Sequence, residues 1–178
     1  MYKNVYEDLL KQKENNKLTE ETIEKLNTVL DLAKDRPIYE IGMDFGNRLI
    51  YLKENGGNVL GGCEFDPMYA VYGNSLNGLF NFGLRIDSHY SIKDFDHFTR
   101  YSDKHKFVYT YHFLDRCDES LRQELYEKIM ECAEEVLFLE DCLPRLKLKD
   151  LYISPEAVED IKNWAGSNKD SKNLDEEK

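Results

Sequence analysis

The sequence predicts an α/β protein with an open, mostly parallel sheet of about five to six strands, flanking helices and a pair of helices before the sheet. Three observations predict this class. Short apolar segments alternate with helical patterns from residue 37 to about residue 142, an order typical of parallel strands joined by crossover helices. The apolar segments lack polar alternation, as expected of strands that are covered on both faces. Two helical patterns precede Pro37.

The first of these patterns, over residues 2–13, places its tyrosine and leucine side chains on one helical face. The second begins at Thr19, a residue suited to cap a helix, and continues with two glutamates in its first turn. Leu18 and Ile23 stand where a hydrophobic staple would place them. Residues 1–36 are therefore expected to form an N-terminal helical cap.

Residues 37–166 are expected to form the main domain, in which strands and helices alternate. Strands are expected at residues 37–42, 59–63, 83–87, 107–113 and 135–140, and helices at 47–55, 68–80 and 118–133. Alternating charge favours an edge strand at 145–149, and Ser154-Pro155 favours the start of a last helix that ends near Gly166. Residues 88–104 read as a polar irregular segment, and residues 167–178 as a disordered tail.

The charge and composition exclude several classes of function. The chain has 178 residues and a net charge of −11, which repels phosphate backbones and makes free nucleic acid an unfavourable partner. It has no apolar run of the ~18 residues that a membrane span needs, and its first residues are too polar for a secretory signal. The four cysteines match no zinc spacing and are expected to be reduced thiols. We therefore expect a cytoplasmic protein without a bound metal.

The spacing of residues 38–67 points to a cofactor that contains a nucleoside. A strand ends at Gly42, a turn with Gly46 leads into a helix, and the next strand ends at Glu64, 22 residues after Gly42. An acidic residue at that place can accept hydrogen bonds from both hydroxyl groups of a ribose. A dinucleotide is disfavoured because Asp44 stands where the pyrophosphate-binding pattern needs a glycine. The chain also lacks the phosphate-binding pattern of P-loop proteins.

Two motifs resemble those of the class I S-adenosylmethionine-dependent methyltransferases. Their first motif, an acidic residue, a hydrophobic residue and a glycine-rich turn, is matched by Glu40-Ile41-Gly42-Met43-Asp44-Phe45-Gly46, and their second by Gly62-Cys63-Glu64-Phe65-Asp66-Pro67. The resemblance implies a Rossmann-like sheet, S-adenosylmethionine as cofactor and S-adenosylhomocysteine as product. It further implies cofactor contacts from these residues: Glu40, Gly42, Asp44, Gly46, Glu64 and, after the third strand, Asp87.

The chain departs from the family pattern at two points. Asp44 replaces the usual middle glycine, where it could accept a bond from the ammonium group of the cofactor or repel its carboxylate. The family usually adds a sixth and a seventh strand, whereas only about 35 residues follow the fifth strand here. We therefore expect a truncated sheet, compatible with a minimal enzyme, a different acceptor site or a pseudoenzyme.

The candidates for the acceptor side of the site are Tyr111, His112 and His89. A histidine can take a proton near neutral pH, and methyl transfer needs an unprotonated acceptor. Tyr111 and His112 are neighbours on the predicted strand, so only one of them can face a given pocket. The competing interpretation of each is a structural side chain that packs on the sheet.

Two classes of function follow. The first is methyl transfer to a small molecule or a protein acceptor. The second is a catalytically inactive, methyltransferase-like interaction module, or an acidic regulatory or inhibitor protein. In either case a protein partner could complete the site.

Overall fold

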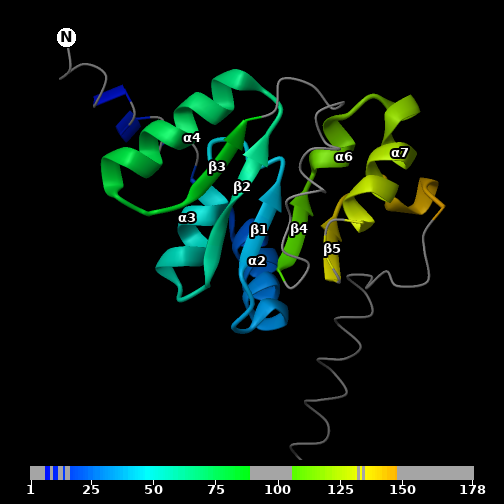
Figure 1. Cartoon of the computed structure of the whole chain (residues 1–178), viewed down its shortest axis with the longest axis horizontal. Coiled ribbons are helices and arrows are strands. Elements are labelled where there is room, and N and C mark those ends of the chain that lie inside the picture. Colours follow the sequence, from blue (N-terminus) through cyan, green and yellow to red (C-terminus); the bar gives the residue numbers. More distant parts are fainter. Residues whose placement is uncertain are drawn as a thin grey trace, which may run out of the picture.

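Within the residues that the structure describes, five strands form one all-parallel sheet in the order β3-β2-β1-β4-β5 (Figure 1). The computed structural model describes residues 17–88, 106–131 and 135–147, together with positions 7, 8, 10, 11, 14 and 133. The strands are β1 (Ile38–Ile41), β2 (Val59–Glu64), β3 (Arg85–Ser88), β4 (Phe107–Tyr111) and β5 (Glu135–Leu139). The helices are α2 (Glu20–Ala33), α3 (Asn47–Glu54), α4 (Pro67–Phe80), α6 (Phe113–Arg116), α7 (Glu119–Met130) and the 3-10 helix η2 (Leu143–Arg145). The expected α/β class is confirmed.

The strand order creates a switch point at the middle of the sheet. The chain runs from β1 through β2 to β3 on one side of β1, and then crosses to β4 and β5 on the other side. In open α/β sheets, ligands bind in the crevice beyond the carboxyl ends of the strands at such a point. A ligand site is therefore expected at the turns that follow β1 and β4.

Helices cover both faces of the sheet, which explains why the strands are apolar on both sides. One hydrophobic core joins the sheet to α2 and α3 through leucines such as Leu26, Leu49 and Leu52. The other joins the sheet to α6, α7 and η2 through residues such as Phe113 and Tyr126. In Figure 1, α3 and α4 accompany the β3–β1 half of the sheet, and α6 and α7 accompany the β4–β5 half.

Local signals at the helix starts account for where the helices begin. The Thr19 side chain accepts a hydrogen bond from the N–H of Thr22 at 3.2 Å, as the predicted cap requires. Asp66 caps α4 in the same way, accepting from the N–H of Met68 at 2.8 Å. Asp118 stands at the predicted N-cap position of α7, but its side chain makes no capping hydrogen bond.

Two predicted strands differ from the structure. β4 ends at Tyr111 rather than at residue 113, because His112 has φ = 50° and a left-handed residue cannot continue a strand. The following short helix, α6, is stabilised by Glu140, whose carboxylate accepts from the N–H groups of Phe113 at 2.9 Å and Asp115 at 3.1 Å. Of the edge strand expected at 145–149, Arg145 is the last residue of η2, residues 146–147 are in no strand, and residues 148–149 lie outside the described residues.

Some expectations fall outside the described residues: the segment 88–104 after its first residue, the last helix and the C-terminal tail, and most of the first helix. Within the described part, no helix combines the length and the apolar character needed to cross a bilayer. Among the described residues, Cys63, Cys117 and Cys142 form no disulfide. Burial raises the pKa of Cys142 to about 12, so this thiol is neutral at physiological pH.

Candidate functional site

The turn after β1 has a conformation that depends on its glycines. Gly42, Asp44 and Gly46 all have positive φ, at 75°, 53° and 80°. A Cβ atom at Gly42 would lie 2.4 Å from the Phe113 ring, so that ring packs directly on the turn. A Cβ atom at Gly46 would meet nothing within 4 Å, so the turn is open on that side. The two glycines therefore have different roles, close packing at one and access at the other.

Glu64 joins the end of β2 to this turn. Its carboxylate accepts a hydrogen bond from the N–H of Asp44 at 2.8 Å. It also accepts from the N–H groups of Phe65 at 2.7 Å and Asp66 at 3.2 Å. The residue is 4% exposed. A carboxylate offers about four acceptor positions, so Glu64 keeps capacity for one further donor.

Glu40 lies beneath the turn and is fully buried. Its carboxylate accepts a hydrogen bond from Nε of Arg48 at 2.5 Å, and the two form an ion pair. Burial raises the pKa of Glu40, and the Arg48 guanidinium opposes this shift. Arg48 also donates to Asp44 at 3.0 Å and to the Gly42 carbonyl at 3.0 Å. Glu40 thus supports the turn through Arg48.

Arg116 holds the same turn from the other side. Its guanidinium pairs with Asp44, donates to the Gly42 carbonyl at 3.2 Å and donates to the His112 carbonyl at 3.1 Å. Asp44 therefore lies between two guanidinium groups, and the turn does not present an unpaired negative charge. Sequence analysis missed both arginines. Arg48 could have been found from its place four residues after Asp44 on a helix, a spacing at which side chains meet.

A cavity of about 440 Å³ opens beside the turn. Its walls come from the turn itself at Met43–Phe45, from the start of α2, and from Tyr111 at the end of β4. Lys17, Arg48 and Arg116 bring positive charge to it, and Asp44 brings negative charge. Its size is within the range of small-molecule sites.

Tyr111 and His112 occupy different positions at the end of β4. Tyr111 lines the cavity, and its hydroxyl forms a 2.9 Å hydrogen bond with Thr22 of α2. His112 follows the end of β4 and is not among the lining residues, but its ring packs edge-on against Tyr111 with centroids 4.7 Å apart. His89 lies outside the described residues.

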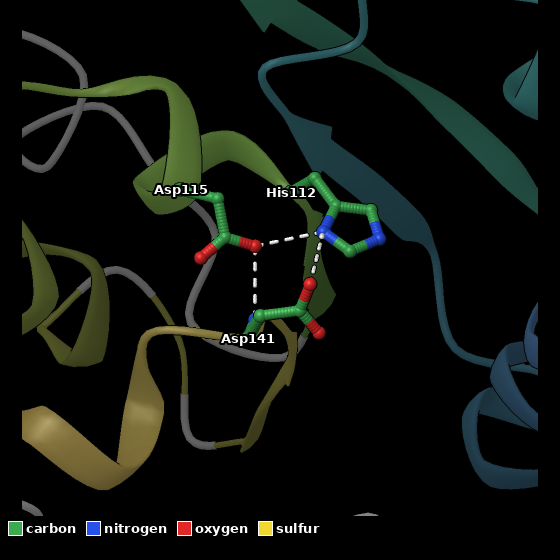
Figure 2. Close-up of side chains that lie close together, drawn as sticks. All are labelled: His112, Asp115 and Asp141. Carbon is green, nitrogen blue, oxygen red and sulfur yellow. Dashed lines mark hydrogen bonds and ion pairs between the residues drawn. The ribbon is translucent and has the colours of Figure 1, made fainter.

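His112 belongs to a cluster with Asp115 and Asp141, in which Figure 2 shows the two carboxylates on the same side of the ring. Nδ1 of His112 lies 2.7 Å from Asp115 Oδ2 and 3.8 Å from Asp141 Oδ2. Each of the three side chains offers an atom that could ligate a metal ion. However, Asp115 Oδ2 already receives the Asp141 N–H at 2.8 Å as well as the ring nitrogen. The arrangement is therefore that of a hydrogen-bonded pair.

Asp87 lies one strand further from the switch point, on β3. Its carboxylate accepts a hydrogen bond from the Tyr39 hydroxyl at 2.8 Å and pairs with Arg85 at 3.1 Å. Asp87 is thus part of β3 itself, and its contact with an adenine ring stays a prediction. The structure thus brings Glu40, Gly42, Asp44, Gly46 and Glu64 together at the end of β1 and β2, and places Asp87 on β3, beyond β2.

Comparison with known proteins supports the fold. No family model matches the chain, and no curated protein matches it. Among solved structures, the chain is similar to WbdD, solved in complex with the kinase inhibitor LY294002, with a TM-score of 0.50 and 9% sequence identity. The match covers 68% of this chain and 30% of the WbdD chain, so the chain spans less than a third of that protein. At this identity the likeness concerns the Rossmann-like fold alone.

Proposed function

We propose that the protein is an S-adenosylmethionine-dependent methyltransferase that acts on a small molecule or a protein acceptor. The observation that carries this proposal is the 2.8 Å hydrogen bond from the Asp44 N–H to the Glu64 carboxylate. It brings the glycine turn after β1 and the acidic end of β2 together, beside a cavity at the switch point of the sheet. Nucleoside cofactors bind at this place in open α/β sheets.

The chemical groups around the turn fit this cofactor. The Asp44 carboxylate can accept a hydrogen bond from the ammonium group of the cofactor. Lys17 and Arg116, which line the same cavity, can donate to its carboxylate. Glu64 retains acceptor capacity for a ribose hydroxyl, and the turn is open at Gly46. When bound, the cofactor supplies an electrophilic methyl group on a sulfonium, and the chain holds it in place.

The test is a calorimetric titration of the full chain with S-adenosylmethionine and with S-adenosylhomocysteine. We expect micromolar binding to the wild-type protein. Glu64→Gln should weaken binding at least about tenfold, which corresponds to ~1.4 kcal/mol, because it removes the charge that receives the ribose hydroxyl. Glu24→Gln is the matched control, since Glu24 is an exposed residue of α2 that does not line the cavity.

The proposal fails if a folded wild-type protein binds neither ligand at millimolar concentration. It also fails if Glu64→Gln and Glu24→Gln bind both ligands as the wild type does. Circular dichroism and thermal unfolding of each variant separate a lost site from a lost fold.

A second candidate function, an interaction module without catalysis, is favoured by one specific contact. Phe113 packs on Gly42 and stacks on Phe65 with ring centroids 5.3 Å apart, so aromatic side chains of the protein itself cover one side of the turn. The two guanidinium groups that neutralise Asp44, those of Arg48 and Arg116, are likewise supplied by the protein itself and not by a ligand. Absence of cofactor binding in the titration above would support this candidate, and the next experiment would be to capture a partner protein.

A further inference from the structure

His112 has the form that a general base requires. Asp115 is an ionised acceptor, so the 2.7 Å contact is a hydrogen bond from the Nδ1–H of His112 to Asp115 Oδ2. Figure 2 shows the other ring nitrogen, Nε2, pointing away from Asp115 and Asp141. None of the residues that the structure describes forms a hydrogen bond with Nε2. An imidazole with its proton on Nδ1 carries a lone pair on Nε2, where it can accept a proton.

The Asp115 carboxylate is held rigidly by the loop after β5. Its Oδ1 accepts from the N–H of Cys142 at 2.8 Å, and its Oδ2 accepts from the N–H of Asp141 at 2.8 Å. Burial on its own would raise the pKa of Asp115, but these hydrogen bonds and the one from His112 outweigh it and lower the pKa. The carboxylate is therefore charged and oriented before any acceptor binds.

The backbone of His112 is fixed as well. It has φ = 50°, a conformation that is uncommon for residues other than glycine and that clusters at functional sites. Its N–H donates to the Leu139 carbonyl at 3.0 Å, and its carbonyl accepts from Arg116 at 3.1 Å. The His112 ring lies against Tyr111, which lines the cavity. The ring therefore stands at the edge of the proposed site with its orientation set by β4, α6 and β5.

We infer that His112 is the general base of the methyl transfer and that Asp115 is its positioning residue, an inference that rests on the proposed function. Nε2 takes the proton from a hydroxyl or a protonated amine group of the acceptor, so an N–H bond forms on the ring as the O–H or N–H bond of the acceptor breaks. The acceptor atom keeps that electron pair and uses it to bond the methyl carbon, while the carbon–sulfur pair leaves with sulfur. The proton then passes from Nε2 to water. The acceptor is thus a compound whose reacting oxygen or nitrogen carries a proton.

The first test reads the His112 ring directly by ¹⁵N NMR of the full chain labelled at histidine. The four histidines give four sets of ring signals, and His112→Asn identifies one of them, since asparagine tolerates a positive φ. We expect the proton of neutral His112 on Nδ1. Asp115→Asn should abolish this preference. Asp141→Asn, the matched control, should keep it, because Asp141 is 87% exposed and lies 3.8 Å from Nδ1.

A proton on Nε2 in the wild-type protein would overturn the inference. So would an Asp141→Asn variant that changes the ring signals as much as Asp115→Asn does. If Asp115→Asn fails to fold, the wild-type spectrum and the Asp141→Asn spectrum still decide the question.

The second test separates this inference from the proposed function. His112→Asn should bind S-adenosylmethionine as tightly as the wild type in calorimetry, because the proposed cofactor contacts come from the turn after β1, Glu64 and the cavity cations and not from His112. Its transfer of a tritiated methyl group to tyramine, a probe with both a hydroxyl and an amine, should fall about 100-fold. If the wild-type protein does not bind S-adenosylmethionine, the proposed function is refuted. If His112→Asn binds the cofactor and transfers the methyl group as fast as the wild type does, only the role of His112 is refuted.

Discussion

The N–H of Asp44 donates a hydrogen bond to the carboxylate of Glu64 at 2.8 Å, which ties the turn after β1 to the end of β2. The two residues are 20 positions apart in the chain, and the parallel pairing of β1 with β2 makes them neighbours. Glu64 is thus both a candidate ligand residue and a structural one. Its contribution to stability can be measured separately from binding.

Glu64→Ala should lower the free energy of unfolding by about 2 kcal/mol, because it leaves three backbone N–H groups near the turn without their acceptor. Urea unfolding followed by circular dichroism measures the change. The exposed Glu24→Ala variant should differ from the wild type by less than about 0.5 kcal/mol. Equal stability of the two variants would show that the carboxylate of Glu64 does not hold the turn.

Alanine at the two turn glycines should have unequal effects. Both positions have positive φ, which costs an alanine ~1–2 kcal/mol. At Gly42 the new Cβ would also lie 2.4 Å from the Phe113 ring, whereas at Gly46 it would meet nothing within 4 Å. We therefore expect Gly42→Ala to be less stable than Gly46→Ala by a further ~1–3 kcal/mol in urea unfolding.

The contact with Phe113 can be isolated in a double variant. In a Phe113→Ala background, the additional cost of Gly42→Ala should shrink, since the ring atoms Cδ2 and Cγ at 2.4 and 2.8 Å are gone, although Cβ of residue 113 remains at 2.8 Å. An undiminished difference between the two glycine variants in that background would assign the cost to the backbone of the turn and not to the ring.

The parts of the fold that could be predicted were those with local signals. Thr19 and the glutamates after it predict the start of α2, and the alternation of apolar and helical segments predicts the parallel sheet. The spacing from Gly42 to Glu64 predicts that both residues lie at the carboxyl ends of neighbouring parallel strands, because the lengths of a strand and of a crossover helix determine this spacing.

The contacts that complete the site come from residues distant in sequence. Arg116 pairs with Asp44 across 72 positions, and Glu140 caps α6 across 27 positions, so no local pattern reveals either. The left-handed conformation of His112 depends on such contacts as well, and for this reason β4 was predicted to be two residues too long. Asp115 is different: it follows His112 by three residues, and that spacing is visible in the sequence.

The buried pair of Glu40 and Arg48 should be strongly coupled. Arg48→Met leaves the Glu40 carboxylate buried without its partner and should cost ~3–5 kcal/mol at pH 7. The double variant Glu40→Gln with Arg48→Met should cost less than the sum of the two single changes, as a thermodynamic cycle from urea unfolding would show. Additive costs would contradict an interaction between the two side chains.

Acid should weaken the contribution of Asp115 to stability. The pKa of Asp115 is lowered in the folded protein from its ordinary value of 3.8, because the hydrogen bonds to its carboxylate outweigh the effect of burial. A group of this kind stabilises the fold fully above its unfolded pKa and loses that contribution as the pH falls through the folded pKa. The stability difference between the wild type and Asp115→Asn should therefore shrink as the pH falls below about 4. Urea unfolding of both proteins at several pH values measures this difference, with Asp141→Asn as the exposed control. A difference that stays constant down to about pH 2 would show that the Asp115 carboxylate does not ionise more easily in the folded state.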